Sequence, residues 1–275
     1  MSRITGRFQE LRERGRTALI PYITAGDPQP AVTVALMHAL VKAGADILEL
    51  GVPFSDPMAD GPTIQAACER ALVHHVSLHN VLDMVREFRR QDAATPVVLM
   101  GYLNPVEVMG YAEFARAARA AGVDGVLTVD LPPEEGHDLV VQLKAAELDP
   151  IFLAAPTSSD ARIRQMSDNG GGFLYYVSFK GVTGANRLDV AAVRDKLQQI
   201  RANTGLPVGV GFGIRDAETA TRIAEFSDAV VVGSALVNRI AALADQPERI
   251  VAEAPAIIAE MRSAMDAGDS VAAAN

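Results

Sequence analysis

The chain has 275 residues, with 25 Lys or Arg against 34 Asp or Glu, so its formal net charge is −9. This acidic balance argues against nucleic acids and anionic membranes as partners, because both attract clustered positive charge. The single cysteine excludes an internal disulfide framework and is typical of a reducing compartment. No run approaches the ~18 consecutive apolar residues of a membrane span, and the charged N-terminus lacks the apolar region of a signal peptide. The sequence therefore predicts a soluble, cytoplasmic protein.

Short apolar runs alternate with longer amphipathic segments along the whole chain, and no Pro- or Gly-rich linker divides it. Most short runs are continuously apolar, as is typical of parallel strands that are covered on both faces. The eight predicted strands are 18–24, 45–51, 96–101, 125–130, 150–154, 173–178, 207–211 and 228–233. This series predicts a single (β/α)₈ barrel domain over residues 1–275. The alternative is an open doubly wound sheet, which usually has a glycine-rich phosphate turn after strand 1, where this chain has only Gly26.

Helices are predicted between the strands and at three additional places. Those between strands include 30–43, 111–121, 134–146, 190–204 and 217–226. An extra N-terminal helix, Arg3–Glu13, has apolar side chains on one side and is expected to close the end of the barrel opposite the site. Extra helices are expected after strand 2, over 62–73 and 78–91, and after strand 8, where Ser234 begins a short helix. The Ala-rich segment 263–275 is predicted to be a frayed tail.

A carboxylate stands within the apolar second strand, at Glu49. Burying a carboxylate is costly unless it is paired, and burial raises its pKa. A carboxyl group whose pKa lies nearer neutrality can both give and take a proton, as a general acid/base must. Because alternate residues of a strand share a face, Glu49 is expected to point with Ile47 and Gly51 into the barrel mouth. The alternative is a structural glutamate paired with a buried arginine, but no arginine stands at a strand end facing it.

The loop after this strand adds two carboxylates, Asp56 and Asp60, among three prolines. Prolines restrict the backbone, so these side chains can be presented at a lower entropic cost. On spacing alone Asp60, before Gly61, is an ordinary helix N-cap. By the same reasoning Asp56, before Pro57, is a turn residue.

Glycines follow three of the later strands and together predict a phosphate site. They occur in Gly211-Phe212-Gly213, in Gly233-Ser234 and, after strand 6, in Gly181-Val182-Thr183-Gly184. Glycine lets backbone N–H groups approach an anion, and a helix that begins at Ser234 points its N-terminal dipole at the charge. Each glycine alone is also compatible with a tight turn. The segment 179–187 is long enough to form a lid over the site.

Other side chains give no sign of imine or metal chemistry. None of the four lysines lies on a predicted strand, which argues against a Schiff-base aldolase. No histidine ends a strand, and the pair His75 and His79 lacks a third ligand nearby, so no metal site is expected. Cys68, within a predicted helix, is expected to pack rather than to react. The chemistry is therefore assigned to carboxylates.

The motifs together resemble the tryptophan synthase alpha chain family. The residues that carry the resemblance are 48–57 and 59–62, with further matches at 21–28, 130–132, 181–184 and 211–214. It extends from about Phe8 to about Met261. The resemblance implies a (β/α)₈ barrel that cleaves indole-3-glycerol phosphate to indole and glyceraldehyde 3-phosphate in tryptophan biosynthesis, without a cofactor of its own. It further implies an α₂β₂ complex with a beta chain, which holds pyridoxal phosphate and consumes the indole.

The resemblance also implies roles for individual residues. Glu49 would move the proton at indole C3 and assist the glycerol hydroxyl, and Asp60 would accept a hydrogen bond from the indole N–H. Substrate contacts are expected from Tyr22, Tyr175, Thr183, Gly184, Phe212, Gly213, Gly233 and Ser234. The beta chain is expected near Pro53, Asp56, Pro57, Asn104 and Pro132. Tyr22 departs from the family, in which phenylalanine is common at this position.

Two other functions stay open on the sequence alone. One is a stand-alone lyase that releases free indole, which full activity without a partner would favour. The other is a catalytically silent barrel that binds phosphate and regulates a partner, which a turnover assay would separate from a lyase. The fold by itself is also compatible with a phosphosugar isomerase, because barrels host many reactions.

Overall fold

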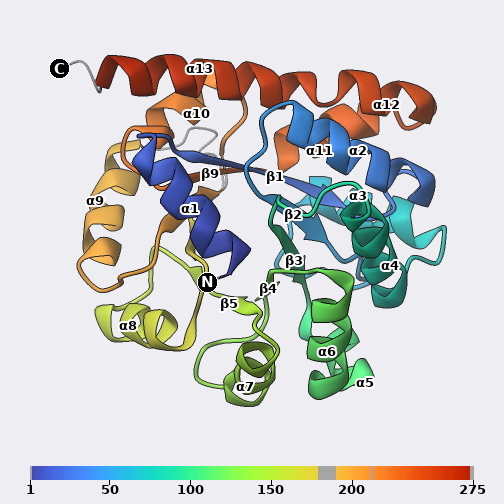
Figure 1. Cartoon of the computed structure of the whole chain (residues 1–275), viewed down its shortest axis with the longest axis horizontal. Helices are drawn as coiled ribbons and strands as arrows, with labels where there is room; N and C mark the ends of the chain where they lie inside the picture. Colours follow the sequence, from blue (N-terminus) through green and yellow to red (C-terminus); the bar gives the residue numbers. More distant parts are fainter. Residues whose placement is uncertain (1, 179–189, 212, 273–275) are drawn as a thin grey trace.

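The strands form one closed parallel barrel. The computed structural model describes residues 2–178, 190–211 and 213–272 (Figure 1). Within them lie nine strands: β1 (Ala18–Thr24), β2 (Leu48–Gly51), β3 (Val97–Gly101), β4 (Gly125–Thr128), β5 (Asp149–Ile151), β6 (Leu153–Ala154), β7 (Leu174–Val177), β8 (Val208–Gly211) and β9 (Ala229–Val232). The sheet order is β5-β4-β3-β2-β1-β9-β8-β7-β6, and every pair is parallel. The predicted (β/α)₈ barrel is confirmed.

The structure has nine strands rather than the eight predicted because the fifth predicted strand is divided. Its first part, β5, pairs with β4, and its second part, β6, pairs with β7. Phe152 lies between the two parts, and its carbonyl accepts a hydrogen bond from the backbone N–H of Tyr175 at 3.0 Å. The two ends of the sheet order are thus one continuous piece of chain, which closes the barrel.

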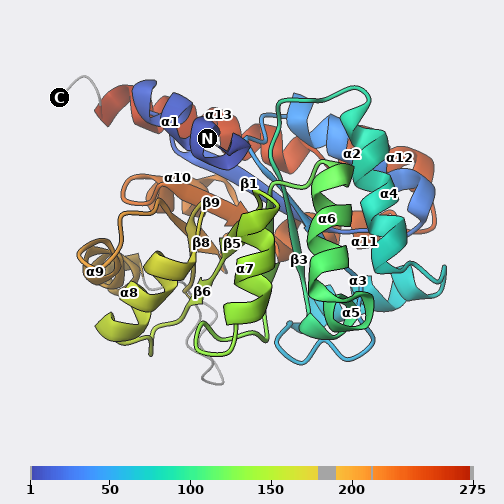
Figure 2. The same cartoon turned by 60° about the horizontal axis from the view of Figure 1, so that its bottom comes forward.

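Helices surround the barrel on its outer side, and one further helix, α1, covers an end of it (Figures 1 and 2). They are α1 (Arg3–Glu13), α2 (Pro30–Lys42), α3 (Pro62–Leu72), α4 (Leu78–Arg89), α5 (Leu103–Met109), α6 (Tyr111–Ala121), α7 (His137–Ala145), α8 (Asp160–Asn169), α9 (Val190–Arg201), α10 (Ala217–Ala224), α11 (Ser234–Ala242), α12 (Pro247–Glu253) and α13 (Ala256–Ala272). The extra helices predicted after strands 2 and 8 are confirmed. The short α5 is a further helix that the sequence analysis did not predict. None of these described helices is both long and apolar enough to cross a membrane.

The C-terminal segment differs from its prediction. The sequence predicts a frayed tail from Ser263, whereas α13 continues as a helix through Ala272. Met265 is fully buried, and α13 packs along α10. An apolar residue in the middle of the Ala-rich segment therefore holds it against the barrel.

The N-terminal helix closes one end of the barrel, as predicted. Ile4, Phe8 and Leu11 of α1 are buried in the same cluster as inward-facing residues of the strands. The Phe8 ring lies 5.8 Å from the ring of Phe173, which directly precedes β7. Figure 2 shows α1 at one end of the molecule and α5 at the other. Water is thereby excluded from the barrel interior at the end that α1 covers.

Replacing Phe8 by alanine should leave a cavity at this closed end. Deleting a buried phenylalanine side chain typically costs about 3–5 kcal/mol. We expect urea unfolding at 25 °C to show a loss of that size for Phe8→Ala. Gln9→Ala, at an exposed position of the same helix, serves as the control and should change the free energy of unfolding by less than about 0.5 kcal/mol. Equal effects for the two variants would contradict the packing role of α1.

Candidate active site

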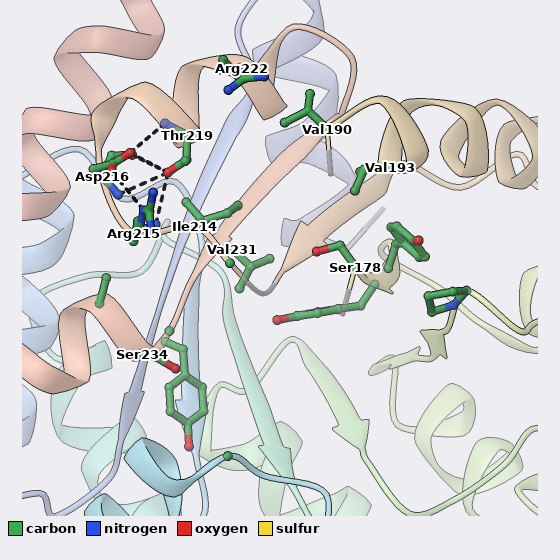
Figure 3. Close-up of a pocket in the computed structure, with 18 of the residues that line it drawn as sticks. Ser178, Val190, Val193, Ile214, Arg215, Asp216, Thr219, Arg222, Val231 and Ser234 are labelled. Carbon is green, nitrogen blue, oxygen red and sulfur yellow. Dashed lines mark hydrogen bonds and ion pairs between the residues drawn. The ribbon is translucent and has the colours of Figure 1, made fainter. Parts of the chain in front are cut away.

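A cavity of about 1030 Å³ opens where the strands end (Figure 3). Among its lining residues are seven of the predicted site residues: Tyr22, Glu49, Asp60, Tyr175, Gly213, Gly233 and Ser234. The cavity continues outward past Ile214 to α9 and α10, where Val193 and Thr219 line it. The predicted site residues Thr183, Gly184 and Phe212, and the predicted lid over 179–187, lie outside the described residues. The predicted catalytic and substrate-contact residues that are described thus lie around one cavity.

Glu49 is the buried acid of this cavity. Glu49 is 1% exposed, and neither of its carboxylate oxygens has a hydrogen-bond partner among the described residues. In the barrel Glu49 stands level with Tyr22 of β1 and Val98 of β3. Burial, and to a lesser extent the charge of Asp60, raise the pKa of Glu49 to about 8. The group therefore holds its proton at neutral pH and can exchange it close to neutrality.

Two tyrosines reach into the cavity over glycines of neighbouring strands. A side chain at Gly51 would collide with the hydroxyl of Tyr22, and one at Gly211 with the hydroxyl of Tyr175. Both tyrosines are about 95% buried, at 6% and 5% exposure. Burial is the main reason that their pKa values lie well above the ordinary value. Both phenols therefore remain neutral hydrogen-bond donors.

Asp60 lies at the cavity rim, directly before α3. The N-cap residue of α3 is Gly61. The prediction that Asp60 is the N-cap is therefore wrong. Its carboxylate instead accepts a hydrogen bond from the hydroxyl of Tyr102 at 2.9 Å. Partial burial raises the pKa of Asp60, and the bond from Tyr102 acts in the opposite direction. The carboxylate thus faces the cavity without a helix N–H of its own to bind.

Tyr102 is a supporting residue that the sequence analysis did not assign to the site. It follows β3, the strand next to β2, and stacks on Phe54 with 5.0 Å between ring centroids. Its hydroxyl accepts a hydrogen bond from the Ala59 N–H at 3.0 Å while it donates to Asp60. One side chain therefore holds both parts of the loop after β2. Its place directly after a strand adjacent to β2 was the available signal.

The opposite side of the cavity has the features of an anion site. The helix α11 begins at Ser234, and its N-cap residue is Gly233, which has no side chain to cap the helix. The first turn of α11 contains no acidic residue. Gly213, at φ +77°, lines the same cavity. Uncapped N–H groups and the helix dipole together favour a negative charge at this point.

The residues expected near a beta chain differ in exposure. Asp56 and Asn104 are exposed, Pro57 and Pro132 are half-buried, and Pro53 is buried. Pro53 is therefore placed to shape the loop rather than to offer surface. Two apolar side chains are strongly exposed beside these residues, Met58 at 79% and Val108 at 83%.

The side chains set aside in the sequence have ordinary surroundings. Within the described part of the chain, no three His, Cys, Asp or Glu side chains gather as they would around a metal ion. The thiol of Cys68 is buried, and burial raises its pKa, which disfavours the reactive thiolate.

Comparisons with known proteins agree with this geometry. The sequence profile of the family "Tryptophan synthase alpha chain" matches residues 8–266. The chain belongs to the tryptophan synthase alpha chain family. It is 68% identical to the tryptophan synthase alpha chain of Thioalkalivibrio sulfidiphilus over 97% of this chain and 100% of the relative.

Solved structures show the same fold. Tryptophan synthase subunit alpha from Legionella pneumophila matches with a TM-score of 0.91 and 46% identity, over 97% of this chain and 99% of that one. A chain of the tryptophan synthase complex from Pyrococcus furiosus matches with a TM-score of 0.80 and 35% identity, over 90% and 98% of the two chains. The protein is thus a lyase of tryptophan biosynthesis that acts on indole-3-glycerol phosphate and forms a complex with a beta chain. In this family pyridoxal phosphate belongs to the beta chain.

The buried state of Glu49 predicts a pH-dependent stability. Below its ordinary value of 4.5 the carboxyl is protonated in both folded and unfolded chains. Between 4.5 and about 8 only the unfolded chain releases the proton, so the folded wild type loses stability as the pH rises. Glu49→Gln lacks this loss. We therefore expect its free energy of unfolding, relative to that of wild type, to increase by as much as about 1.4 kcal/mol per pH unit.

Urea unfolding of both proteins between pH 5 and 9 measures this advantage. Glu69→Gln, at an exposed position of α3, is the matched control and should show no such trend. A Glu49→Gln advantage that is constant over the whole range would show that Glu49 ionises normally in the folded protein.

Proposed function

We propose that Glu49 is the acid/base group that cleaves indole-3-glycerol phosphate. Its protonated carboxyl delivers a proton to indole C3, and the resulting carboxylate takes the proton of the hydroxyl on the first glycerol carbon. The bond between that carbon and indole C3 then breaks, its electron pair passes to the indole ring, and the alcohol becomes the aldehyde of glyceraldehyde 3-phosphate. The observation that carries this proposal is a buried carboxyl without a partner, whose pKa is raised to about 8.

Asp60 supports the same step from the indole side. Protonation at C3 places positive charge on the ring nitrogen, and a carboxylate that accepts a hydrogen bond from the indole N–H stabilises this charge as it develops. Tyr102 holds the Asp60 carboxylate in place at 2.9 Å. Asp60 therefore contributes more to the transition state than to the bound ground state.

The phosphate anchors the other end of the substrate. Gly213, Gly233 and Ser234 offer backbone N–H groups and the start of α11 to the anion, and Gly184 is assigned to the same site on the family motif. On the family motif, Tyr175 is assigned to the glycerol chain, Phe212 to substrate binding, and Thr183 to a contact with Asp60 when the lid closes. Binding energy from the phosphate thus orients the reacting end.

The reaction belongs to an α₂β₂ complex in the cytoplasm. The beta chain is proposed to bind near Asp56, Pro57, Asn104 and Pro132. These residues are exposed or half-buried. Met58 and Val108 extend this surface with exposed apolar area. The single cysteine is in keeping with the reducing cytoplasm. A silent regulatory barrel is disfavoured because both carboxylates line the cavity.

Replacing Glu49 by glutamine should abolish most of the cleavage. Glutamine keeps the size of the side chain but cannot exchange a proton, so kcat should fall by at least about 10²–10⁴-fold. The chain has no Trp, so indole release can be followed by fluorescence with little protein background. Binding of 3-indolylpropyl phosphate, which has the ring and phosphate without the glycerol hydroxyls, should persist. Undiminished turnover would rule out the acid/base role of Glu49.

Replacing Asp60 by asparagine should lower kcat more than it raises KM. The charge that the carboxylate stabilises is largest in the transition state, so the loss falls mainly on the chemical step. Steady-state kinetics of indole formation separate the two constants. Asp83→Asn, at an exposed position of α4, is the control and should match wild type. A change confined to KM would place Asp60 in ground-state binding only.

A further inference from the structure

The strand between the acid and the proposed phosphate end carries two hydroxyl groups, one of them on the expected substrate contact Tyr22. β1 lies between β9 and β2 in the sheet. β9 leads into Gly233 and Ser234, and β2 carries Glu49. Adjacent strands are about 4.8 Å apart, so a substrate held at both ends crosses β1 over a distance of about 10 Å. Any polar group that β1 points into the barrel therefore lies along the middle of the substrate.

Tyr22 and Thr24 are these polar groups. They are two residues apart on one strand, so both face the barrel interior. The Tyr22 Oη lies 3.1 Å from the Thr24 Oγ1, and the two residues are 6% and 2% exposed. Two hydroxyls have two hydrogens, and the bond between them uses only one. Within the described residues, neither hydroxyl makes another hydrogen bond, so one donor is left for a ligand.

The position of the Tyr22 hydroxyl relative to Glu49 follows from the strand geometry. The hydroxyl fills the space that a side chain at Gly51 would occupy. Gly51 is two residues beyond Glu49 on the same inner face of β2, which is a rise of about 6.6 Å toward the mouth. Glu49 stands at the lower end of this interval and lines the same cavity as Tyr22. The phenol and the carboxyl therefore border the same space from above and below.

From this arrangement we infer that the hydroxyl pair of Tyr22 and Thr24 is the subsite for the glycerol hydroxyls of the substrate. This rests on the proposed lyase function. The free hydroxyl hydrogen of the pair donates to a glycerol oxygen and keeps the hydroxyl on the first glycerol carbon turned toward Glu49. Burial keeps the phenol neutral, so Tyr22 donates a hydrogen bond and transfers no proton. Because phenylalanine is common at this position in the family, the contribution adds to a reaction that does not require it.

The test compares two ligands that differ only in the glycerol hydroxyls. One hydrogen bond to the substrate corresponds to a change of about 2- to 10-fold. We expect Tyr22→Phe to lower kcat/KM for indole-3-glycerol phosphate by that factor. The inhibition constant of 3-indolylpropyl phosphate, which has no hydroxyl for the pair to bind, should change less than 2-fold.

Variants at Thr24 provide the matched control. Thr24→Val should lower kcat/KM in the same range, whereas Thr24→Ser keeps the hydroxyl and should stay close to wild type. The double variant Tyr22→Phe/Thr24→Val should lose less than the product of the two single losses, because both serve one subsite. Circular dichroism and thermal unfolding confirm that each variant is folded.

Two outcomes would overturn the inference. Equal losses for substrate and 3-indolylpropyl phosphate would show that the pair only shapes the cavity wall, and an unchanged kcat/KM in Tyr22→Phe would show that the hydroxyl is unused. Glu49→Gln measured in the same series keeps the two proposals apart. An inactive Glu49→Gln beside an unaffected Tyr22→Phe leaves the lyase mechanism standing and removes only the hydroxyl subsite.

Discussion

Burying the carboxyl of Glu49 costs free energy, because both of its oxygens lie away from water without a hydrogen-bond donor among the described residues. That cost is also the source of its chemistry, since it is the absence of solvent and of donors that moves its pKa close to neutrality. The barrel must therefore be closed below Glu49 and open above it. Phe8 and its neighbours on α1 exclude water at the lower end, and the cavity admits the substrate at the upper end. Stability given up at this one position is thus recovered through the packing of the surrounding barrel.

The register between neighbouring strands decides which residues stand side by side at the mouth of the barrel. Interactions at the opposite end of the strands hold this register. Aspartates that stand one or two residues before three strands accept a hydrogen bond from a backbone N–H of the preceding strand. The pairs are Asp46 with Leu19, Asp124 with Val97 and Asp228 with Val208, at 2.9, 2.8 and 2.8 Å. Each aspartate also pairs with an arginine from outside the strand, namely Arg262, Arg89 and Arg201. Because side chains alternate between faces, a slip of one residue would turn Glu49 out of the barrel, and these charged pairs oppose such a slip.

The sequence predicted those features that depend on local pattern. The period of two in β2 predicts Glu49 inside the barrel, and the glycines Gly213 and Gly233 after the later strands line the same cavity. The division between β5 and β6 leaves no such pattern, because an apolar segment has the same composition whichever neighbour it pairs with. The prediction that Asp60 is the N-cap is wrong because spacing alone does not distinguish Asp60 from Gly61. The bond from Tyr102 joins residues 42 positions apart, and only the adjacency of β2 and β3 brings them together.

The pairing of β1 with both β2 and β9 brings the two sides of the cavity together. Tyr22 on β1 stands level with Glu49 on β2, while β1 also pairs with β9, the last strand of the chain. The acid and the anion site become neighbours only when the first and last strands meet. Contacts between such distant parts of a sequence carry a larger loop-closure cost, because the loop they close is long. Until β1 pairs with β9, Glu49 and the start of α11 are not neighbours, so the cavity that they line requires the completed barrel.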